Sequence, residues 1–331
     1  MADSLVVLDV GHGSCSVLHE GQSVAVIDAG PGAALLEYLQ STGIKDIDLV
    51  VVSHSDADHL GGLVALLASD EFNVSTILIN TDSQKASRAW NDLRVLIADK
   101  QSQGRLTLKL GVYSGPITEW TPGKTRLEAV SPSVSMALGG AGSNTVDGAK
   151  VTQNTNSIAV RVLYEEKPIV FLGADIDAVT LDDIKKSRKA CEAPFLVFPH
   201  HGGKPGEADP ADFARQLLAL VKPNHVIFSN GRGLHDTPRP EIVQAVIAAK
   251  GISIGCTQLS KHCCAGDLPK PTPHVSALYS HGAARGHSCT GTIEIDLKRA
   301  EIASPSLKAH GEFVIKFETA MCRESLTSSV T

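Results

Sequence analysis

The sequence has neither a long hydrophobic run nor an excess of positive charge. No apolar stretch in its 331 residues reaches the roughly 18 residues that a membrane-spanning helix needs. The opening residues, MADSLVVLDVGHG, lack the basic segment and the cleavage site of a secretory signal. We therefore expect a cytoplasmic protein that has no membrane partner.

Positive charge and cysteine are both scarce. The formal net charge is −6 with histidine neutral, so no overall basic field would attract nucleic acid. A phosphate polymer would have to be held by metal ions and a local basic patch. The chain has seven cysteines, an odd and scattered set that argues against a secreted disulfide scaffold. The sequence does not indicate an oligomeric state.

What the sequence does contain is an alternation of short apolar segments with helical patterns. Strands are expected at residues 5–10, 15–20, 23–30, 48–55 and 75–80, and helices at 32–43, 61–70 and 87–101. The second part adds strands at 157–166, 168–175, 193–203 and 225–231, and helices at 178–187, 210–223 and 238–251. This order predicts an α/β fold in which two sheets pack face to face with helices outside.

We interpret residues 1–331 as a single domain with pseudo-halves of about 1–135 and 157–331. The glycine-rich stretch between them, 136–156, is expected to be flexible. A segment rich in cysteine and histidine, 256–290, is expected to be a small insertion.

The most informative stretch is HSDADH, residues 54–59, which follows the apolar segment LVVVS. Polar residues also follow other expected strands, namely Asp28, Asp175, His200, His201 and His235. Strand ends gather at one edge of such folds, so these side chains can meet there. In an extended chain, His54, Asp56 and Asp58 would point to one side and His59 to another. That arrangement favours two metal ions, about 3.5 to 4 Å apart, which would hold a bridging hydroxide.

These motifs carry a family resemblance. HSDADHLGG, with VIDAG upstream and FLGAD and PHHGG downstream, resembles the metallo-β-lactamase superfamily, whose motif is usually HxHxDH. More narrowly, LDVGHGSCSVLHEGQSVAVIDAG, NTNSIAVRVLYEEKPIVFLGAD and FPHHGG are similar to the nuclease domain of the competence protein ComEC, here without its membrane channel. The resemblance covers about residues 5 to 235 and implies a four-layer αββα metallo-β-lactamase sandwich.

The resemblance also implies a metal site. Its cofactors would be two divalent ions, manganese or zinc and otherwise magnesium. The implied ligands are His54, Asp56, Asp58, His59, Asp175 and one of His200 and His201. Asp175 would bridge the ions, and Asp28 would brace the metal loop without binding metal. Asp58, Asp175 and His235 are the expected catalytic residues.

Three departures from the family pattern bear on the metal. Asp56 stands where most members have histidine, NTNS at 154–157 replaces another histidine, and GHGS at 11–14 replaces GQGD. A carboxylate and an amide in place of two imidazoles make one position richer in oxygen, which favours Mn²⁺ or Mg²⁺ over an all-nitrogen zinc site. His235 would complete this depleted position.

The expected activity is metal-dependent hydrolysis, above all phosphodiester cleavage of DNA. The partner is therefore nucleic acid or a small phosphodiester, and the candidate substrate contacts are Asn154, Asn156, Lys204 and Arg232. Two alternatives are a hydrolase of a cyclic nucleotide, lactone or thioester and a non-enzymatic binding member of the fold. Clustered carboxylates repel one another without a cation, which argues against the second alternative.

Structural roles compete with several of these assignments. An aspartate of HSDADH, or Asp175, would also suit a helix cap. His235 and the two asparagines would also suit polar turns, and the two basic side chains would also suit solvated surface. Further along the chain, a structural zinc is one interpretation, with buried thiols and a disulfide as alternatives, for Cys256, Cys263, Cys264 and Cys289.

Overall fold

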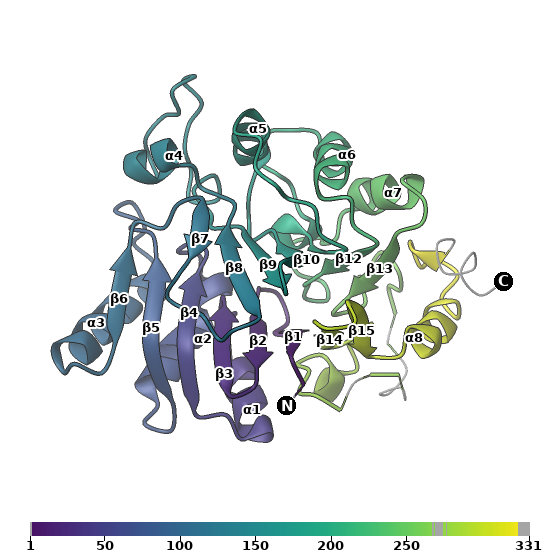
Figure 1. The fold of residues 1–331 in the computed structure, drawn as a ribbon. Helices are drawn as coiled ribbons and strands as arrows, with labels where there is room; N and C mark the ends of the chain where they lie inside the picture. The colour runs from purple at the N-terminus through teal and green to yellow at the C-terminus, as the bar shows by residue number, and fades with distance from the viewer. Residues whose placement is uncertain (1, 267, 269–273, 276, 324–331) are drawn as a thin grey trace.

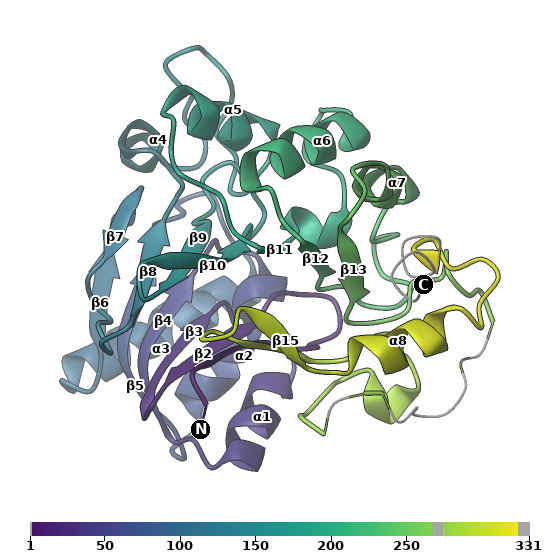
Figure 2. The same ribbon diagram turned by 45° about the vertical axis from the view of Figure 1, so that its right-hand side comes forward.

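The computed structural model describes residues 2–266, 268, 274–275 and 277–323. Two β-sheets lie face to face, with helices on their outer sides (Figures 1 and 2). The first sheet contains, in spatial order, β15 (Glu301–Ser304), β14 (Ile293–Asp296), β1 (Ser4–Val7), β2 (Ser16–Glu20), β3 (Ser23–Ile27), β4 (Asp46–Val52), β5 (Asn73–Ile79) and β6 (Thr107–Leu110). The second contains β13 (Ser253–Cys256), β12 (His225–Phe228), β11 (Phe195–Val197), β10 (Lys167–Leu172), β9 (Val160–Tyr164), β8 (Thr125–Ala129) and β7 (Gly115–Ile117).

Helices cover the outer faces of both sheets (Figure 1). The first sheet packs against α1 (Ala34–Thr42), α2 (Ala57–Ala68) and α3 (Arg88–Ser102). The second packs against α5 (Ala178–Lys186), α6 (Pro210–Val221) and α7 (Pro240–Ala248). Shorter elements are α4 (Val134–Gly139), η1 (Pro199–Gly202), η2 (Ala283–Arg285) and α8 (Leu307–Val314). No helix in the described part of the chain is long and apolar enough to cross a membrane.

Side-chain alternation explains the layers. In β4, Leu49 and Val51 belong to the cluster between the sheets, whereas Val50 and Val52 pack toward the helices. Successive side chains of a strand point to opposite faces, so one apolar run supplies two cores. The expected αββα sandwich is confirmed.

The two sheets do not divide at the glycine-rich stretch 136–156. Strands β7 and β8 precede that stretch but belong to the second sheet, while β14 and β15 return to the first. The stretch itself lies between β8 and β9, contains part of α4, and forms backbone hydrogen bonds such as Gly142 N to Val151 O at 2.8 Å. The pseudo-halves 1–135 and 157–331 therefore do not coincide with the two sheets. The sequence does not predict this, because β7 and β8 are short and have no clear apolar run.

The parallel strands place the site. β3, β4, β5 and β6 pair in parallel, as do β10, β11, β12 and β13. The loops that follow β4, β10 and β11 carry HSDADH, Asp175 and the two adjacent histidines of η1. Because parallel strands align their carboxyl ends, these loops from two different sheets meet at one end of the sandwich.

Candidate metal centre

The HSDADH segment is a turn followed by a helix, not an extended loop. β4 ends at Val52, and α2 begins at Ala57, four residues earlier than the helix expected at 61–70. Asp58 and His59 consequently lie in the first helical turn, where the helix dipole favours negative charge. Asp56 occupies the N-cap position but makes no capping hydrogen bond, so its carboxylate has another role.

Asp28 orients the two histidines of this segment, His59 directly and His54 through Ser53. Its Oδ2 accepts a hydrogen bond from Nδ1 of His59 at 2.7 Å, and its Oδ1 accepts one from the backbone N of Ser53 at 2.7 Å. The Ser53 hydroxyl donates to Asp28 at 2.8 Å and lies 3.0 Å from Nδ1 of His54. With both Nδ1 atoms held in this way, Nε2 of each ring is left for a metal ion. This is the geometry expected of a bracing residue.

One ligand group consists of His54, His59 and Asp175, all buried, whose ligand atoms lie within 4.8 Å of one another. Nε2 of His59 is 3.2 Å from Oδ1 of Asp175, and Nε2 of His54 is 3.9 Å from Oδ2. Asp175 does not cap α5, because Asp177 accepts the capping bond from the Thr180 N at 3.0 Å. The carboxylate of Asp175 is thus available to the site.

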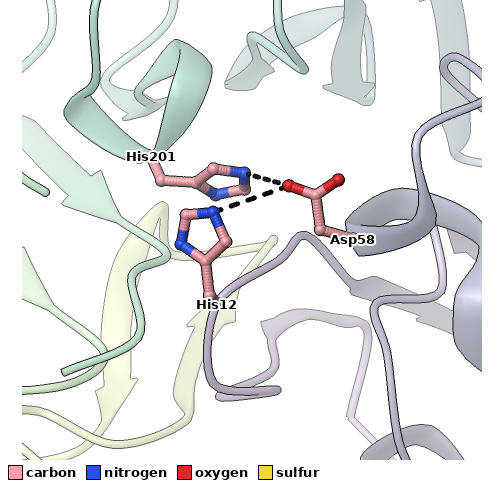
Figure 3. A group of neighbouring side chains, drawn as sticks. All are labelled: His12, Asp58 and His201. Carbon is pink, nitrogen blue, oxygen red and sulfur yellow. Dashed lines mark ion pairs between the residues drawn. The ribbon is translucent and has the colours of Figure 1, made fainter. Parts of the chain in front are cut away.

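A second ligand group consists of His12, Asp58 and His201, again within 4.8 Å of one another (Figure 3). Oδ2 of Asp58 is 3.3 Å from Nε2 of His201 and 3.6 Å from Nε2 of His12. Nδ1 of His201 donates to the backbone oxygen of Ser229 at 2.7 Å, which directs Nε2 inward. Oδ1 of Asp175 lies 3.9 Å from the same Nε2, so Asp175 stands between the two groups.

The shifted pKa values of the site residues follow from the same arrangement. Burial alone would raise the pKa of Asp175, but His200 and His59 hold that pKa well below its ordinary value. Burial would lower the pKa of His59, yet Asp175 and Asp28 raise it well above its ordinary value. Burial and the neighbouring His201 lower the pKa of His12 to about 4, so its imidazole is neutral at neutral pH. The carboxylates therefore create a field that attracts a cation.

The residues fit divalent metal ions. Several buried imidazole nitrogens have no hydrogen-bond partner among the described residues, namely Nε2 of His54, His59, His200 and His201 and Nδ1 of His12. A buried polar atom without a partner is costly, and clustered imidazole and carboxylate groups are the usual ligands of Zn²⁺ and Mn²⁺.

A sequence profile for the metallo-beta-lactamase superfamily matches residues 8–174. The chain belongs to this superfamily. Similar solved structures include Tm1679, a metal-dependent hydrolase of the β-lactamase superfamily (13% identity, 76% of this chain and 95% of that chain covered, TM-score 0.47). Another is the metallo-β-lactamase fold protein YhfI from Bacillus subtilis (13% identity, 76% of this chain and 96% of that chain covered, TM-score 0.45). A third is a diphosphatase from the PhnP family (14% identity, 77% of this chain and 95% of that chain covered, TM-score 0.44). No curated protein matches the sequence.

Metallo-β-lactamase superfamily proteins are generally divalent-metal-dependent hydrolases, typically with zinc, and this chain offers two candidate ligand groups. Of the ligands implied by resemblance, the structure brings His54, Asp58, His59, Asp175 and His201 into these groups. His200 is near, with Nδ1 3.3 Å from Oδ2 of Asp175, but it belongs to neither group. Between the two adjacent histidines, the geometry therefore favours His201 as the ligand.

Asp56 is the ligand that the structure places differently. Its Oδ1 forms an ion pair with Nζ of Lys85, although its Oδ2 is still 3.7 Å from Nε2 of His54. Burial would raise the pKa of Asp56, but His54 and Lys85 hold it at about 2. Asp82 holds Lys85 next to Asp56. Its carboxylate accepts one hydrogen bond from the Lys85 backbone N–H at 3.1 Å and another from the Ser55 hydroxyl, which ties the loop after β5 to the HSDADH segment.

Arg232, a predicted substrate contact, makes structural contacts with the backbone. Its guanidinium donates to the backbone oxygens of Leu259, Cys264 and Gly266 at 2.8, 2.8 and 2.7 Å. These bonds hold the loop that follows β13, and they engage both terminal nitrogens of the guanidinium. Sequence alone cannot reveal such backbone partners.

Four further predicted residues belong to neither ligand group, namely the candidate ligand and catalytic residue His235 and the candidate substrate contacts Asn154, Asn156 and Lys204. His235 is exposed, outside both ligand groups, and its ring centroid is 4.4 Å from that of His12. Asn156 is buried with Oδ1 unpartnered among the described residues, and the nearby Ile158 N donates to the Ser53 oxygen at 3.0 Å. Asn154 is half-buried, and the exposed Lys204 pairs with Glu207 at 3.6 Å.

The cysteine-rich segment forms a separate buried cluster. Cys256, Cys263 and Cys289 are buried and Cys264 is partly exposed. None of the seven cysteines, all within the described residues, forms a disulfide. Nε2 of His310 lies 3.2 Å from Sγ of Cys289, and burial raises the pKa of the Cys289 thiol well above its ordinary value. In the described part of the chain, neither group of close metal ligands contains a cysteine, so structural zinc stays a prediction.

Proposed function

We propose that this protein is a two-metal phosphodiesterase that cleaves nucleic acid, DNA in particular. The observation that carries the proposal is the set of buried imidazole nitrogens that face Asp58 and Asp175 and make no hydrogen bond among the described residues. The resemblance of the four ordered motifs to the ComEC nuclease domain supports a phosphodiester substrate, and the oxygen-rich surroundings of His54 support Mn²⁺ or Mg²⁺ in one position.

Asp58 and His201 would hold one ion, and His54, His59 and Asp175 would hold the other. When bound, the ions supply Lewis acidity to the phosphate oxygens and lower the pKa of the attacking water. Hydrolysis adds that water across one P–O bond, and the leaving oxygen takes up a proton. Asp28 and the Ser229 carbonyl keep the His59 and His201 rings in the orientation that this requires.

Two further side chains have functions beside the metals. The Lys85 ammonium, next to Asp56, gives this acidic protein a fixed positive charge close to the centre. The exposed ring of His235, packed against His12, is placed to contact a substrate that enters from solvent.

The test uses metal-free protein supplied separately with Mn²⁺, Mg²⁺ or Zn²⁺ and incubated with linear DNA, circular DNA and a small phosphodiester. We expect cleavage of DNA with Mn²⁺, and a loss of about 100-fold or more in Asp58→Asn and Asp175→Asn, because even supporting groups of metal sites commonly contribute 10- to 100-fold. Asp212→Asn is the matched control, since its carboxylate is exposed on α6, 53% accessible and remote from the centre.

Cleavage of the small phosphodiester alone would replace the nuclease with a small-substrate hydrolase. Absence of cleavage for every substrate, in protein shown to contain bound metal, would overturn the proposal.

A further inference from the structure

His12 enters the metal centre from the GHGS stretch, which contributes none of the metal ligands implied by the resemblance. It lies in the loop between β1 and β2, far in sequence from Asp58 and His201, yet all three side chains converge (Figure 3). The ring centroid of His12 is 4.5 Å from that of His201, and its Nε2 faces the Asp58 carboxylate.

The loop that carries His12 is built together with its two neighbours. The backbone N of Ser14 donates to the backbone oxygen of Asp58 at 3.0 Å, which joins the loop to α2. Ser229 joins it to His201, because its hydroxyl donates to the Gly13 oxygen at 2.7 Å while its carbonyl accepts from His201. A Cβ at Gly13 would lie 2.5 Å from the backbone oxygen of Asp58. The three groups therefore have fixed relative positions.

Asp9 anchors the base of the same loop. Its buried carboxylate accepts hydrogen bonds from the backbone N of Gly11 at 3.0 Å, the Gln258 amide at 2.9 Å, the Ser280 hydroxyl at 2.6 Å and the Gly282 N at 2.8 Å. On the other side, a Cβ at Gly231 would lie 2.5 Å from the His12 N. Such dense packing leaves the imidazole little freedom to turn away.

His12 lacks the partners that a buried histidine normally has. Its Nδ1 is buried without a hydrogen-bond partner among the described residues, and its Nε2 lies 3.6 Å from Oδ2 of Asp58. A separation of this size between two ligand atoms is too long for a hydrogen bond but suits two groups bound to one ion.

We propose that His12 is a metal ligand that joins Asp58 and His201 around one ion. The chain lacks two histidines of the family pattern, at Asp56 and in 154–157, and His12 adds an imidazole on the opposite side of the centre. With His12, the Asp58 position has two imidazoles and one carboxylate, a set that suits a zinc-like ion. The His54 side has two imidazoles with Asp175 and, at 3.7 Å from His54, the carboxylate of Asp56, and is therefore richer in oxygen. The inference rests on the metal centre of the proposed function and on no particular substrate.

The test measures Zn²⁺ and Mn²⁺ binding to metal-free protein by calorimetry and by competition with a chelator. His12→Gln places here the amide that the ComEC pattern has. We expect the tighter Zn²⁺ affinity to fall by about 10- to 100-fold and the preference for Zn²⁺ over Mn²⁺ to shrink. In Co²⁺-loaded protein, the visible spectrum of the tighter position should change, because an imidazole leaves its ligand set.

Two variants complete the experiment. His262→Gln removes a partly exposed imidazole that pairs with Asp236 at 2.8 Å and belongs to neither ligand group, and it should leave the Zn²⁺ affinity unchanged. His12→Asp restores a ligand atom and should recover part of the affinity. Thermal unfolding of the metal-free variants shows whether each one folds.

Wild-type Zn²⁺ affinity and an unaltered Co²⁺ spectrum in folded His12→Gln would overturn the inference. Because binding is measured without substrate, a protein that cleaves no phosphodiester can still support it.

Discussion

At the scale of single residues, the pair of Asp56 and Lys85 decides how open the His54 side is to a cation. Asp56 is one of three carboxylates at the centre with Asp58 and Asp175, and the Lys85 ammonium already binds it. An ion at this position must either share Asp56 with Lys85 or do without it. We therefore expect the oxygen-rich position to bind its ion weakly for two reasons, the loss of a histidine and the presence of an internal cation.

Lys85→Gln removes this internal cation and returns Asp56 to the site. We expect Mn²⁺ to bind the weaker position about tenfold more tightly, the effect of roughly 1.4 kcal/mol less competition. Mn²⁺ electron paramagnetic resonance of metal-free protein measures it directly. Lys204→Gln is the matched control, because it removes the same charge from an exposed residue that pairs only with Glu207. Equal Mn²⁺ affinities in the two variants would contradict this account.

Residues differ in how visible their roles are in the sequence. His54, Asp58 and His59 lie within six positions and form a motif by spacing alone. His12 has a weaker signal, a lone histidine between two glycines directly after a strand, in GHGS. Lys85 has none, because its place depends on the fold of the loop after β5, where Asp82 binds Ser55. Contacts formed only by tertiary packing are not readable from local patterns.

At the scale of elements, the close approach of α2 to the loop after β3 positions the metal ligands. The Gly62 N donates to the Ala29 oxygen at 2.8 Å, and the Ala29 N donates to the His59 oxygen at 2.7 Å. A Cβ on Gly62 would lie only 2.4 Å from the Gly30 oxygen. The helix can come this near to Asp28 only because residue 62 has no side chain.

Gly62→Ala should therefore destabilise the protein, although alanine is the better helix former by about 1 kcal/mol. We expect a net loss of about 1 to 3 kcal/mol in urea unfolding of metal-free protein, the usual effect of overpacking. Gly311→Ala in α8 is the control, since its Cβ would meet no atom within 4 Å. That variant should be neutral or up to about 1 kcal/mol more stable. A Gly62→Ala protein as stable as Gly311→Ala would be inconsistent with the close approach.

Elements with strong local signals were predictable and others were not. α6 begins at Pro210 after the capping Asp209, close to its expected range of 210–223. The start of α2 was missed because Asp56 holds the N-cap position without capping, while Gly61 and Gly62 resembled a helix opening. β7 was missed because it has three residues, one of them proline. β6 was missed because most of its side chains are exposed.

At the scale of the whole molecule, buried neutral histidines outside the metal centre make stability depend on pH. Burial lowers the pKa of His19, in β2 beside Tyr38, to about 4 from an ordinary value of 6.5. Burial likewise lowers the pKa of His310, in α8, to about 3. Between the folded and unfolded pKa values the unfolded chain binds more protons, so the stability from each neutral ring is complete above about pH 6.5 and falls as the pH drops.

The metal-free protein should accordingly lose stability from about pH 6.5 toward pH 4, and His19→Gln should lose less over the same interval. Urea unfolding at several pH values measures both slopes. The difference between them isolates His19, because the histidines of the metal centre titrate equally in the two proteins. Identical slopes would mean that His19 keeps an ordinary pKa when folded.

The return of β14 and β15 to the first sheet has a consequence for the order of synthesis. β1 pairs with β2 on one side and with β14 on the other, where Val7 faces Ile293. In Figure 2, β15, drawn in yellow, lies beside the purple N-terminal strands. The pairing of β1 with β14 can form only after β14 has been synthesised, and the hydrogen bonds of Asp9 likewise need Ser280 and Gly282. Contacts of such long sequence separation form slowly. The loop that carries His12 is therefore anchored only after residues 280 to 282 have been synthesised.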